Sequence, residues 1–163
     1  MISVYKGVAH PWMSDVMGHM TTRHYVAMFD DASYHFLHEV FGWTGESVAS
    51  SALGWVDARH VIEYQAEVSA GDLLEIRAGL RRVGGKSITV IYEMYNLQRN
   101  ELAATLESSC VLFDTAARKG VTIPDDMRAK TAQYLVSDPG CGRKVLVVTG
   151  SRNAGYMMVN SPP

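Results

Sequence analysis

The sequence predicts an α+β fold in which a curved antiparallel sheet wraps along one long helix. Residues 23–41 repeat apolar side chains at helical spacing, and residues 56–113 alternate apolar and polar side chains in runs separated by turns. A short apolar segment before the helix indicates a further strand. One helix beside several antiparallel strands makes two layers that share a single core.

A strand is predicted at residues 4–8, near the N-terminus. Pro11 ends this strand, and a loop then leads into the helix. Gly42 ends the helix, because glycine readily takes the left-handed conformation that closes a last helical turn. The apolar stripe expected to face the core consists of Tyr25, Met28, Phe29, Ala32, Phe36 and Val40.

Four more strands follow a short, helix-compatible connection at residues 45–51. They are expected at residues 56–68, 74–80, 88–94 and 102–113, with turns at 70–72, 84–85 and 96–100. Strict alternation in the first of them predicts one apolar face and one polar face. The apolar face would hold Val56, Ala58, His60, Ile62, Tyr64, Ala66 and Val68, and the polar face Asp57, Arg59, Glu63 and Glu67.

Composition limits the class of protein. The chain has 163 residues, 47% apolar and 20% charged, which is ordinary for one globular domain. A net charge of −2 gives no support to a nucleic-acid partner, which would need a basic surface. Cys110 and Cys141 form no metal spacing and no disulfide framework. Without a signal-peptide pattern or an apolar run of about 20 residues, a cytoplasmic protein that does not enter the membrane is expected.

Asp15 and Gly18 lie in the loop just ahead of the helix. A helix start presents unpaired backbone N–H groups and the positive end of the helix dipole, so it can hold and polarise an electron-rich oxygen. A carboxylate held nearby can attack a carbonyl polarised there, or activate a water that attacks it. The plainer alternative is that Asp15 only forms a turn by bonding its own backbone.

This segment resembles the signature of the hotdog-fold acyl-CoA thioesterases of the 4-hydroxybenzoyl-CoA thioesterase type. In that family an Asp, a Gly three residues on and a Tyr ten residues on mark the active-site loop and the central helix, as Asp15, Gly18 and Tyr25 do here. Many members have Asn-Asn where this chain has Thr21-Thr22. Further landmarks match in order: Val61 to Tyr64, Val68 to Leu73, Ala103-Ala104, Val111 to Asp114, Ile123-Pro124 and Met127-Arg128.

The resemblance implies the hotdog fold, a curved antiparallel sheet around one long central helix, over residues 1–135. Residues 136–163 would be a C-terminal extension of unknown role, with a linker at 138–144 and a further strand at 145–149. Paired sheets join in this family and the substrate lies between subunits. A homodimer or homotetramer is therefore expected, since one curved sheet also leaves its edges uncovered.

The resemblance also implies roles in the active site. Asp15 would be the catalytic carboxylate, acting as a nucleophile on the thioester carbon or as a base for water. The backbone N–H of Thr22 would polarise the thioester carbonyl as an oxyanion hole, a role that does not need the Asn side chains. Thr21 or Thr22 would otherwise cap the helix, and both roles can hold at once. Tyr25 would belong to the substrate site.

Four other residues are candidates for substrate contacts. His19 would hold the loop by hydrogen bonding or touch the substrate, and His60 is either a buried core residue or part of the acyl pocket. Lys86 and Ser87 match a region that meets the pantetheine or phosphates of coenzyme A in some relatives. A phosphate-binding P-loop is excluded there, because residue 80 is Leu where the motif needs Gly. Solvated surface charge is the better interpretation of Arg118, Lys119 and Arg128.

The sequence therefore predicts an acyl-CoA thioesterase that converts water and an acyl-CoA to the free acid and coenzyme A. No metal or redox cofactor is expected. His35, His38 and Asp31 lie on nearly the same helix face but lack a metal-binding pattern, so they indicate a solvated face. The alternative function is a hotdog protein that binds acyl thioesters without turnover. A hotdog hydratase is a third option, but its usual His-based motif is missing.

Overall fold

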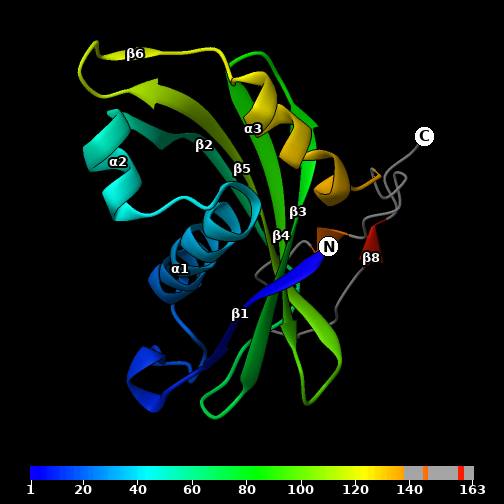
Figure 1. The fold of residues 1–163 in the computed structure, drawn as a ribbon. Coiled ribbons are helices and arrows are strands. Elements are labelled where there is room, and N and C mark those ends of the chain that lie inside the picture. Colours follow the sequence, from blue (N-terminus) through cyan, green and yellow to red (C-terminus); the bar gives the residue numbers. More distant parts are fainter. Residues whose placement is uncertain (138–144, 147–157, 160–163) are drawn as a thin grey trace.

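A computed structural model describes residues 1–137, 145–146 and 158–159. It confirms the predicted architecture: a curled antiparallel sheet wraps around one long helix (Figure 1). The strands lie in the order β1-β3-β4-β5-β2, and β6 pairs with the end of β5. Their bounds are β1 Ile2–Val8, β2 Leu53–Tyr64, β3 Leu73–Val83, β4 Ser87–Asn96, β5 Glu101–Asp114 and β6 Lys119–Gly120.

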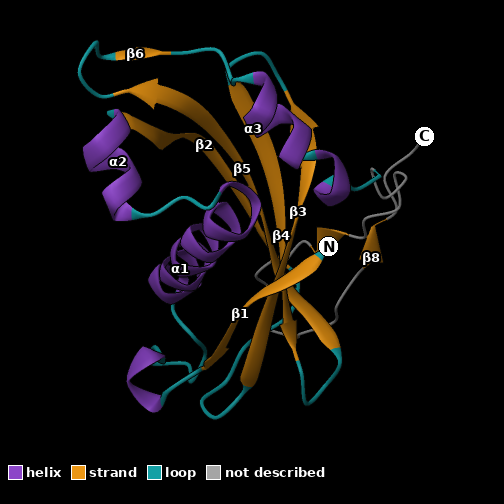
Figure 2. Cartoon of the chain, viewed as in Figure 1, coloured by secondary structure: helices purple, strands orange, loops and turns teal. Residues whose placement is uncertain are grey.

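The central helix α1 (Thr22–Phe41) lies against the inner face of the curved sheet (Figure 2). Its buried side chains include the whole predicted stripe, and burying each large one contributes about 1.5–3 kcal/mol. Gly42 ends α1 in the left-handed conformation, with φ of 67°. The minor helical segments are η1 (Pro11–Met13), α2 (Gly45–Ser51), α3 (Asp125–Lys130) and η2 (Ala132–Tyr134).

Strand β2 differs from its prediction. It begins at Leu53 and ends at Tyr64, so the expected span of 56–68 is wrong at both ends. Asp57 pairs with Cys110 and Arg59 with Ser109 of β5, which leaves Ala58 without a partner in a β-bulge. The extra residue shifts the side-chain alternation by one position.

The bulge changes which side chains of β2 face α1. Before it, Trp55 stacks on Phe41 of α1, with ring centroids 5.0 Å apart, and Asp57 is also turned inward. Val56, predicted to lie on the inner face, is 45% exposed. After the bulge the prediction is right again, and Tyr64 packs edge-on against Tyr25 at 5.1 Å.

Residues 65–68 leave the sheet instead of extending β2. The N–H groups of Gln65 and Ala66 both donate to the carbonyl of Ala103, at 2.8 and 3.1 Å. The chain then passes beside the loop that precedes α1, where the N–H of Met20 donates to the carbonyl of Val68 at 2.7 Å. This crossing ties the loop to the sheet.

Val136 packs against strand β3. The N–H of Val136 donates to the carbonyl of Leu80 at 2.8 Å, and a Cβ on Gly79 would lie 2.6 Å from a methyl of Val136. Gly79 therefore leaves the space that this contact fills. The expected linker at 138–144 and residues 147–149 lie outside the described residues, and β7 (Val145–Leu146) pairs with β8 (Met158–Val159).

Among the described helices, none has both the length and the apolar character required of a membrane span.

Candidate functional site

The loop before α1 is a tight reversal of the chain. The N–H of Asp15 donates to the carbonyl of His19 at 2.8 Å, and the N–H of Gly18 donates back to the carbonyl of Asp15 at 3.1 Å. Gly18 has φ of 86°, a left-handed conformation that glycine adopts without the steric cost of a side chain. The matched glycine of the signature thus sits where the turn needs it.

The carboxylate of Asp15 divides its two oxygens between different environments. Oδ1 accepts hydrogen bonds from the N–H groups of Met17 and His19, at 2.8 and 3.2 Å. Asp15 is therefore a turn former, as the plainer alternative held. Oδ2 accepts no hydrogen bond from any described residue, and the residue is half-buried. One oxygen holds the loop and the other is available for chemistry.

The start of α1 is held next to this turn. The N–H of Thr21 donates to the carbonyl of Met13 at 2.9 Å. Thr22 opens the helix, and its own N–H has no acceptor among the described residues. Thr21 makes no side-chain capping bond, and its Oγ1 is buried without a partner in the described part of the chain. The alternative in which Thr21 caps the helix through its side chain is not observed, and the N–H of Thr22 stays available to an oxygen atom.

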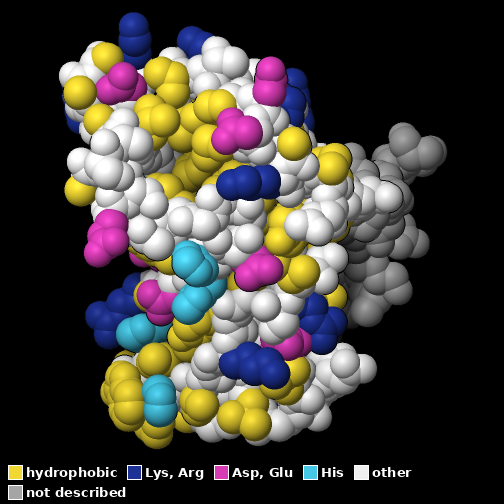
Figure 3. All heavy atoms as spheres, in the orientation of Figure 1, with side chains coloured by type: hydrophobic (Ala, Val, Ile, Leu, Met, Phe, Trp, Pro, Cys, Tyr) yellow, Lys and Arg dark blue, Asp and Glu magenta, His cyan; other side chains and the backbone are white. Residues whose placement is uncertain are grey.

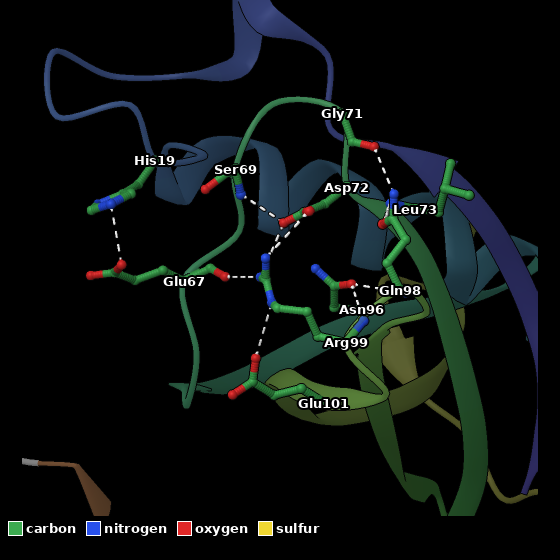
Figure 4. Close-up of polar contacts among 10 residues, drawn as sticks. All are labelled: His19, Glu67, Ser69, Gly71, Asp72, Leu73, Asn96, Gln98, Arg99 and Glu101. Atoms are coloured by element: carbon green, nitrogen blue, oxygen red, sulfur yellow. Dashed lines mark hydrogen bonds and ion pairs between the residues drawn. The ribbon is translucent and has the colours of Figure 1, made fainter.

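A charged network supports the loop from the side of the sheet (Figure 4). Nε2 of His19 lies 3.2 Å from a carboxylate oxygen of Glu67, and the carbonyl of Glu67 accepts from Arg99 at 2.5 Å. Arg99 also pairs with Asp72 at 3.0 Å, and Asp72 accepts from the N–H of Ser69 at 2.8 Å. Sequence reasoning missed Glu67, Asp72 and Arg99, because each reads as an ordinary surface charge.

Tyr25 belongs to the core of the chain. It is only 4% exposed, and burial raises the pKa of its hydroxyl to about 12, so the group is neutral at physiological pH. Its ring supports the first turns of α1 against Tyr64.

Lys86 and Ser87 lie far from the Asp15 loop within one chain. They occupy the hairpin between β3 and β4, where Nζ of Lys86 donates to the carbonyl of Gly120 at 3.2 Å. The loop of Asp15 contacts residues just before β3, so the length of that strand, roughly 30 Å, separates the two regions. A single chain does not bring them together.

A cavity lies between α1 and β2, along the helix from its first turns. Two adjoining hollows make it up, and both are lined by Asp30, Ser33 and Asp57. One extends toward Val26 and Ile62, and encloses about 260 Å³ with its open mouth included. The other encloses about 370 Å³ on the same basis and extends toward residues Leu37, Trp43 and Trp55. We call this space the α1–β2 cavity.

His60 lines the α1–β2 cavity and is not a buried core residue. Its side chain is 37% exposed, and Nε2 lies 3.2 Å from Oδ1 of Asp57. That same oxygen accepts hydrogen bonds from Oγ of Ser108 at 2.8 Å and Sγ of Cys110 at 3.0 Å. Sequence reasoning missed Asp57 because an uninterrupted alternation points it outward.

Hydrogen bonds and burial act in opposite directions on the pKa values of this cluster. Burial acts to raise the pKa of Asp57, but the bonds from Cys110, Ser108 and His60 outweigh it and hold the pKa below its ordinary value. Burial raises the pKa of the Cys110 thiol to about 12. Asp57 is therefore a carboxylate and Cys110 a thiol at physiological pH, and the low thiolate fraction makes Cys110 a poor nucleophile.

No group of three or more His, Cys, Asp or Glu side chains within the described ranges is arranged to hold a metal ion. His38, one of the residues weighed for a metal, has Nδ1 at 3.2 Å from the carbonyl of Trp43 near the end of α1.

A curled antiparallel sheet that wraps around one long helix is the hotdog fold. Residues 9–131 match the family model described as the Thioesterase-like superfamily. The match spans well over half of the chain, and the protein belongs to this family.

Solved structures share the fold at low sequence identity. A Staphylococcus aureus protein in complex with CoA is 17% identical, with a TM-score of 0.77 over 90% of this chain and 96% of that one. A 1,4-dihydroxy-2-naphthoyl-CoA thioesterase from Synechocystis is 16% identical, with a TM-score of 0.68 over 78% and 93%. A gentisyl-coenzyme A thioesterase is 20% identical, with a TM-score of 0.68 over 78% and 98%. The search of curated proteins returned no match.

Proposed function

We propose that this protein is an acyl-CoA thioesterase with Asp15 as its catalytic carboxylate. The observation that carries the proposal is the free Oδ2 of Asp15 in a loop that also holds the unpaired N–H of Thr22 at the helix start. Membership of the Thioesterase-like superfamily supports thioester chemistry. A structural neighbour solved with CoA and two neighbours described as acyl-CoA thioesterases support the substrate class.

The chemistry needs one carboxylate and one oxyanion donor. As a nucleophile, Oδ2 of Asp15 attacks the thioester carbon, the C–S bond breaks, and the thiolate of coenzyme A leaves. Water then hydrolyses the acyl–aspartyl anhydride to the free acid. As a base, Asp15 instead takes a proton from water while the water oxygen attacks the same carbon. In both routes the Thr22 amide donates to the carbonyl oxygen as negative charge develops there.

A second candidate function is acyl-thioester binding without turnover. The bonds from Met17 and His19 to Oδ1 of Asp15 favour it, because they account for this residue by the loop geometry alone. The two candidates agree on the ligand and differ only in whether Oδ2 reacts.

The proposed active unit is a homodimer or homotetramer. Apolar side chains gather at the lower left of Figure 3, the place of the segment before α1 in Figure 1. Trp12, Val16 and Met17 of this segment are 69%, 104% and 71% exposed. On the edge strand β2, Val56 and Tyr64 are 45% and 43% exposed. A second copy that covers these side chains would remove them from water.

Pairing two β2 edges antiparallel would also complete the substrate site. In such a pair the two sheets run in opposite directions. The β3–β4 hairpin of one subunit then approaches the end of the other subunit's sheet that lies beside its Asp15 loop. Lys86 and Ser87 would then contact the coenzyme A part of a substrate whose thioester lies at Asp15. The 30 Å separation within one chain thus fits a site shared between subunits.

The test is Asp15→Asn, assayed with a panel of acyl-CoAs for released thiol. Asn keeps the size of the side chain and an acceptor for the loop amides, but it neither attacks a carbonyl nor takes a proton from water. Turnover is expected to fall by about 10²–10⁴ or more, with acyl-CoA binding and the melting temperature nearly unchanged. Asp31→Asn, on the exposed face of α1, is the matched control. Full turnover in Asp15→Asn excludes the mechanism, and a lost melting transition assigns Asp15 to structure.

A further inference from the structure

The lysines and arginines of the described chain fall into two groups. Five of them lie within 4.0 Å of a carboxylate: Lys6, Arg59, Arg77, Arg81 and Arg99. The other seven have no carboxylate partner among the described residues, and five of these seven lie around the β3–β4 hairpin, at one end of the sheet. We call this region the cationic end, and its members are Arg82, Lys86, Arg118, Lys119 and Arg128.

The cationic end is built around the tip of the hairpin, at the top of the molecule in Figure 1. Nη2 of Arg128 in α3 donates to the carbonyl of Gly84 at 2.8 Å, and Nζ of Lys86 donates to the carbonyl of Gly120 in β6 at 3.2 Å. Lys119 comes directly before Gly120, so their Cα atoms are about 3.8 Å apart. Each of these two contacts uses only one donor, and the other N–H groups of the two side chains stay available.

Few negative charges balance these cations. Residues 82–87 and 114–128 carry five cations and three carboxylates, a local charge of +2 in a chain whose net charge is −2. Oδ1 of Asp114 accepts from the N–H groups of Ala116 and Ala117, at 2.9 and 2.8 Å, which holds the β5–β6 turn. Asp125 and Asp126 lie in the first turn of α3. Charge complementarity therefore favours an anionic ligand at this end.

The hairpin tip adds backbone donors to the cations. The N–H groups of Gly85 and Lys86 bond to no described residue. A Cβ on Gly85 would have no atom within 4 Å, so the backbone there is open to an approaching group. Backbone N–H groups beside Lys and Arg side chains are a common setting for phosphate oxygens in proteins.

Arg118 has a backbone conformation that arginine rarely adopts. Its φ is 55°, in the left-handed region that glycine reaches without a steric cost. Its guanidinium lies 5.5 Å from the centroid of the Phe113 ring. Glycine would suit this turn better, so the backbone alone does not account for an arginine. A need for positive charge at this position accounts for it.

We propose, resting on the thioesterase function above, that the cationic end binds the 3′-phosphate of coenzyme A through Arg118, Lys119 and Arg128. A phosphate monoester carries nearly two negative charges at neutral pH, more than each phosphorus of the diphosphate. Lys86 meets the diphosphate, nearer the pantetheine arm, and the three cations beyond it meet the monoester. The site selects thioesters of intact coenzyme A over thioesters of carriers that lack this phosphate.

Calorimetric titration of the wild-type protein with CoA and with dephospho-CoA tests the site without any hydrolysis. The two ligands differ only in the 3′-phosphate. CoA is expected to bind about tenfold more tightly, because each exposed ion pair contributes only a few-fold in affinity. Raising the salt concentration from about 0.05 to about 0.5 M is expected to reduce this ratio, since exposed charges are screened. Equal affinities at low salt overturn the proposal.

A double variant, Arg118→Gly with Lys119→Ala, is expected to lower the ratio of the two affinities to about twofold. Glycine relieves the left-handed residue, so the melting temperature is expected to stay or rise, whereas a structural role of Arg118 predicts a fall. Lys6→Ala, which removes an exposed lysine from β1, is the matched control and is expected to keep the tenfold ratio. An unchanged ratio in the folded double variant overturns the proposal.

A second variant covers the case in which the double variant does not fold. Arg128→Gln removes the charge and keeps an N–H donor for the carbonyl of Gly84. It is expected to reduce the affinity for CoA about two- to fivefold and to leave that for dephospho-CoA nearly unchanged. An equal loss for both ligands would remove Arg128 from the phosphate site.

These measurements separate the phosphate site from the thioesterase function. If no acyl-CoA is hydrolysed but CoA still binds more tightly than dephospho-CoA, hydrolysis is refuted and the phosphate site stands. If acyl-CoA is hydrolysed and the two ligands bind equally, the phosphate site is refuted. Equal binding together with hydrolysis of an acyl group on an acidic carrier protein, at a KM that the double variant raises, would assign the cationic end to a protein partner and overturn the proposal.

Discussion

At the scale of single residues, the geometry of Asp15 combines a structural role with the proposed chemical one. Its Oδ1 closes the loop through two backbone amides, which fixes the position of Oδ2. A carboxylate held in this way loses little further conformational entropy when it reacts. The structural and catalytic interpretations of Asp15, which compete when only the sequence is considered, are therefore compatible in the folded chain.

Thr22→Pro is expected to remove the oxyanion donor and keep the helix. Thr22 is the first residue of α1, a position where proline is tolerated, and Thr21 already has the extended conformation that a following proline requires, with φ of −69° and ψ of 150°. Since the Thr22 N–H bonds no described residue, its loss breaks no contact of the described fold. We expect kcat to fall by about 10²–10³ with a small change in melting temperature.

The control for that prediction is Thr22→Ala, which deletes the side chain and keeps the amide. Steady-state kinetics of the two variants, with their helix content from circular dichroism, make the comparison. Equal activity in the two folded variants would mean that another group polarises the carbonyl.

The position of a single residue in the fold was predictable from the sequence where the residue belongs to a local sequence pattern. Asp15, Gly18 and Thr22 belong to one continuous segment, so they lie close together in the fold, and their proposed roles come from the resemblance of that segment to the family signature. Asp57 could not be found in this way, because its place at the cavity depends on a bulge and on partners from β5 about 50 residues away. Arg99 was hidden for the same reason, since it reaches the loop only through Glu67 and Asp72.

At the scale of elements, the turn between β4 and β5 acts as a brace for the loop before α1. Oδ1 of Asn96 accepts from the N–H groups of Gln98 and Arg99, at 3.0 and 3.1 Å, which fixes the turn. Gln98 in turn accepts from the N–H of Leu73 at 2.7 Å. Arg99 is thereby held in contact with Glu67 and Asp72, and the side chain of Glu67 in turn pairs with His19 of the loop (Figure 4).

Arg99→Ala is expected to loosen that brace. Three acceptors lose their charged donor, so the crossing beside Met20 and the loop of Asp15 gain freedom. We expect kcat to fall about tenfold with little change in KM, because the position of Oδ2 matters more to the reaction than to binding. The melting temperature is expected to fall by a few degrees. Steady-state kinetics and thermal melting on one preparation measure both effects.

Arg82→Ala provides the comparison, since Arg82 is an exposed arginine near the far end of β3. It is expected to match the wild type in kcat and nearly so in melting temperature. A kcat for Arg99→Ala equal to that of Arg82→Ala would exclude a positioning role for the brace.

The stripe of α1 from Tyr25 to Val40 and the alternation along β3, β4 and β5 predicted the right type of element at nearly the right bounds. Strands β3 and β5 also carry irregularities, at Arg81 and Ala103, but these did not displace the predicted bounds by more than three residues. Strand β2 failed at Ala58 because small or apolar residues on both sides of the bulge imitate a continuous alternation. Its end was misplaced because the period-two pattern continues to Val68, although the backbone has already turned toward the loop.

At the scale of the whole molecule, the proposed homodimer or homotetramer can be tested directly. Light scattering is expected to give at least twice the mass of one chain, and activity per chain is expected to fall when dilution dissociates the assembly. Lys86→Ala is expected to raise KM without a large change in kcat, since it would act on the coenzyme A part of the substrate. A stable and fully active monomer would contradict the shared site.

Truncation is expected to separate the body of the protein from its C-terminal extension. A chain that ends at Ser137 keeps the family match, which spans residues 9–131, and the contact of Val136 with Gly79 and Leu80. We expect it to retain its melting transition and activity. A chain that ends at Tyr134 loses that contact and is expected to melt several degrees lower. Loss of activity in the chain that ends at Ser137 would assign a role to the residues beyond 137.

The bulge at Ala58 also bears on how this strand tolerates change in length. If Ala58 is left out of the count, Leu53, Trp55, Asp57, His60, Ile62 and Tyr64 fall on one face in strict alternation. A one-codon deletion at this position would therefore leave every other residue of β2 facing as it does now, whereas a deletion elsewhere would reverse part of the strand. Ala58 is thus the position in β2 where the loss of one residue is expected to keep both the cavity wall and the loop of Asp15 as they are.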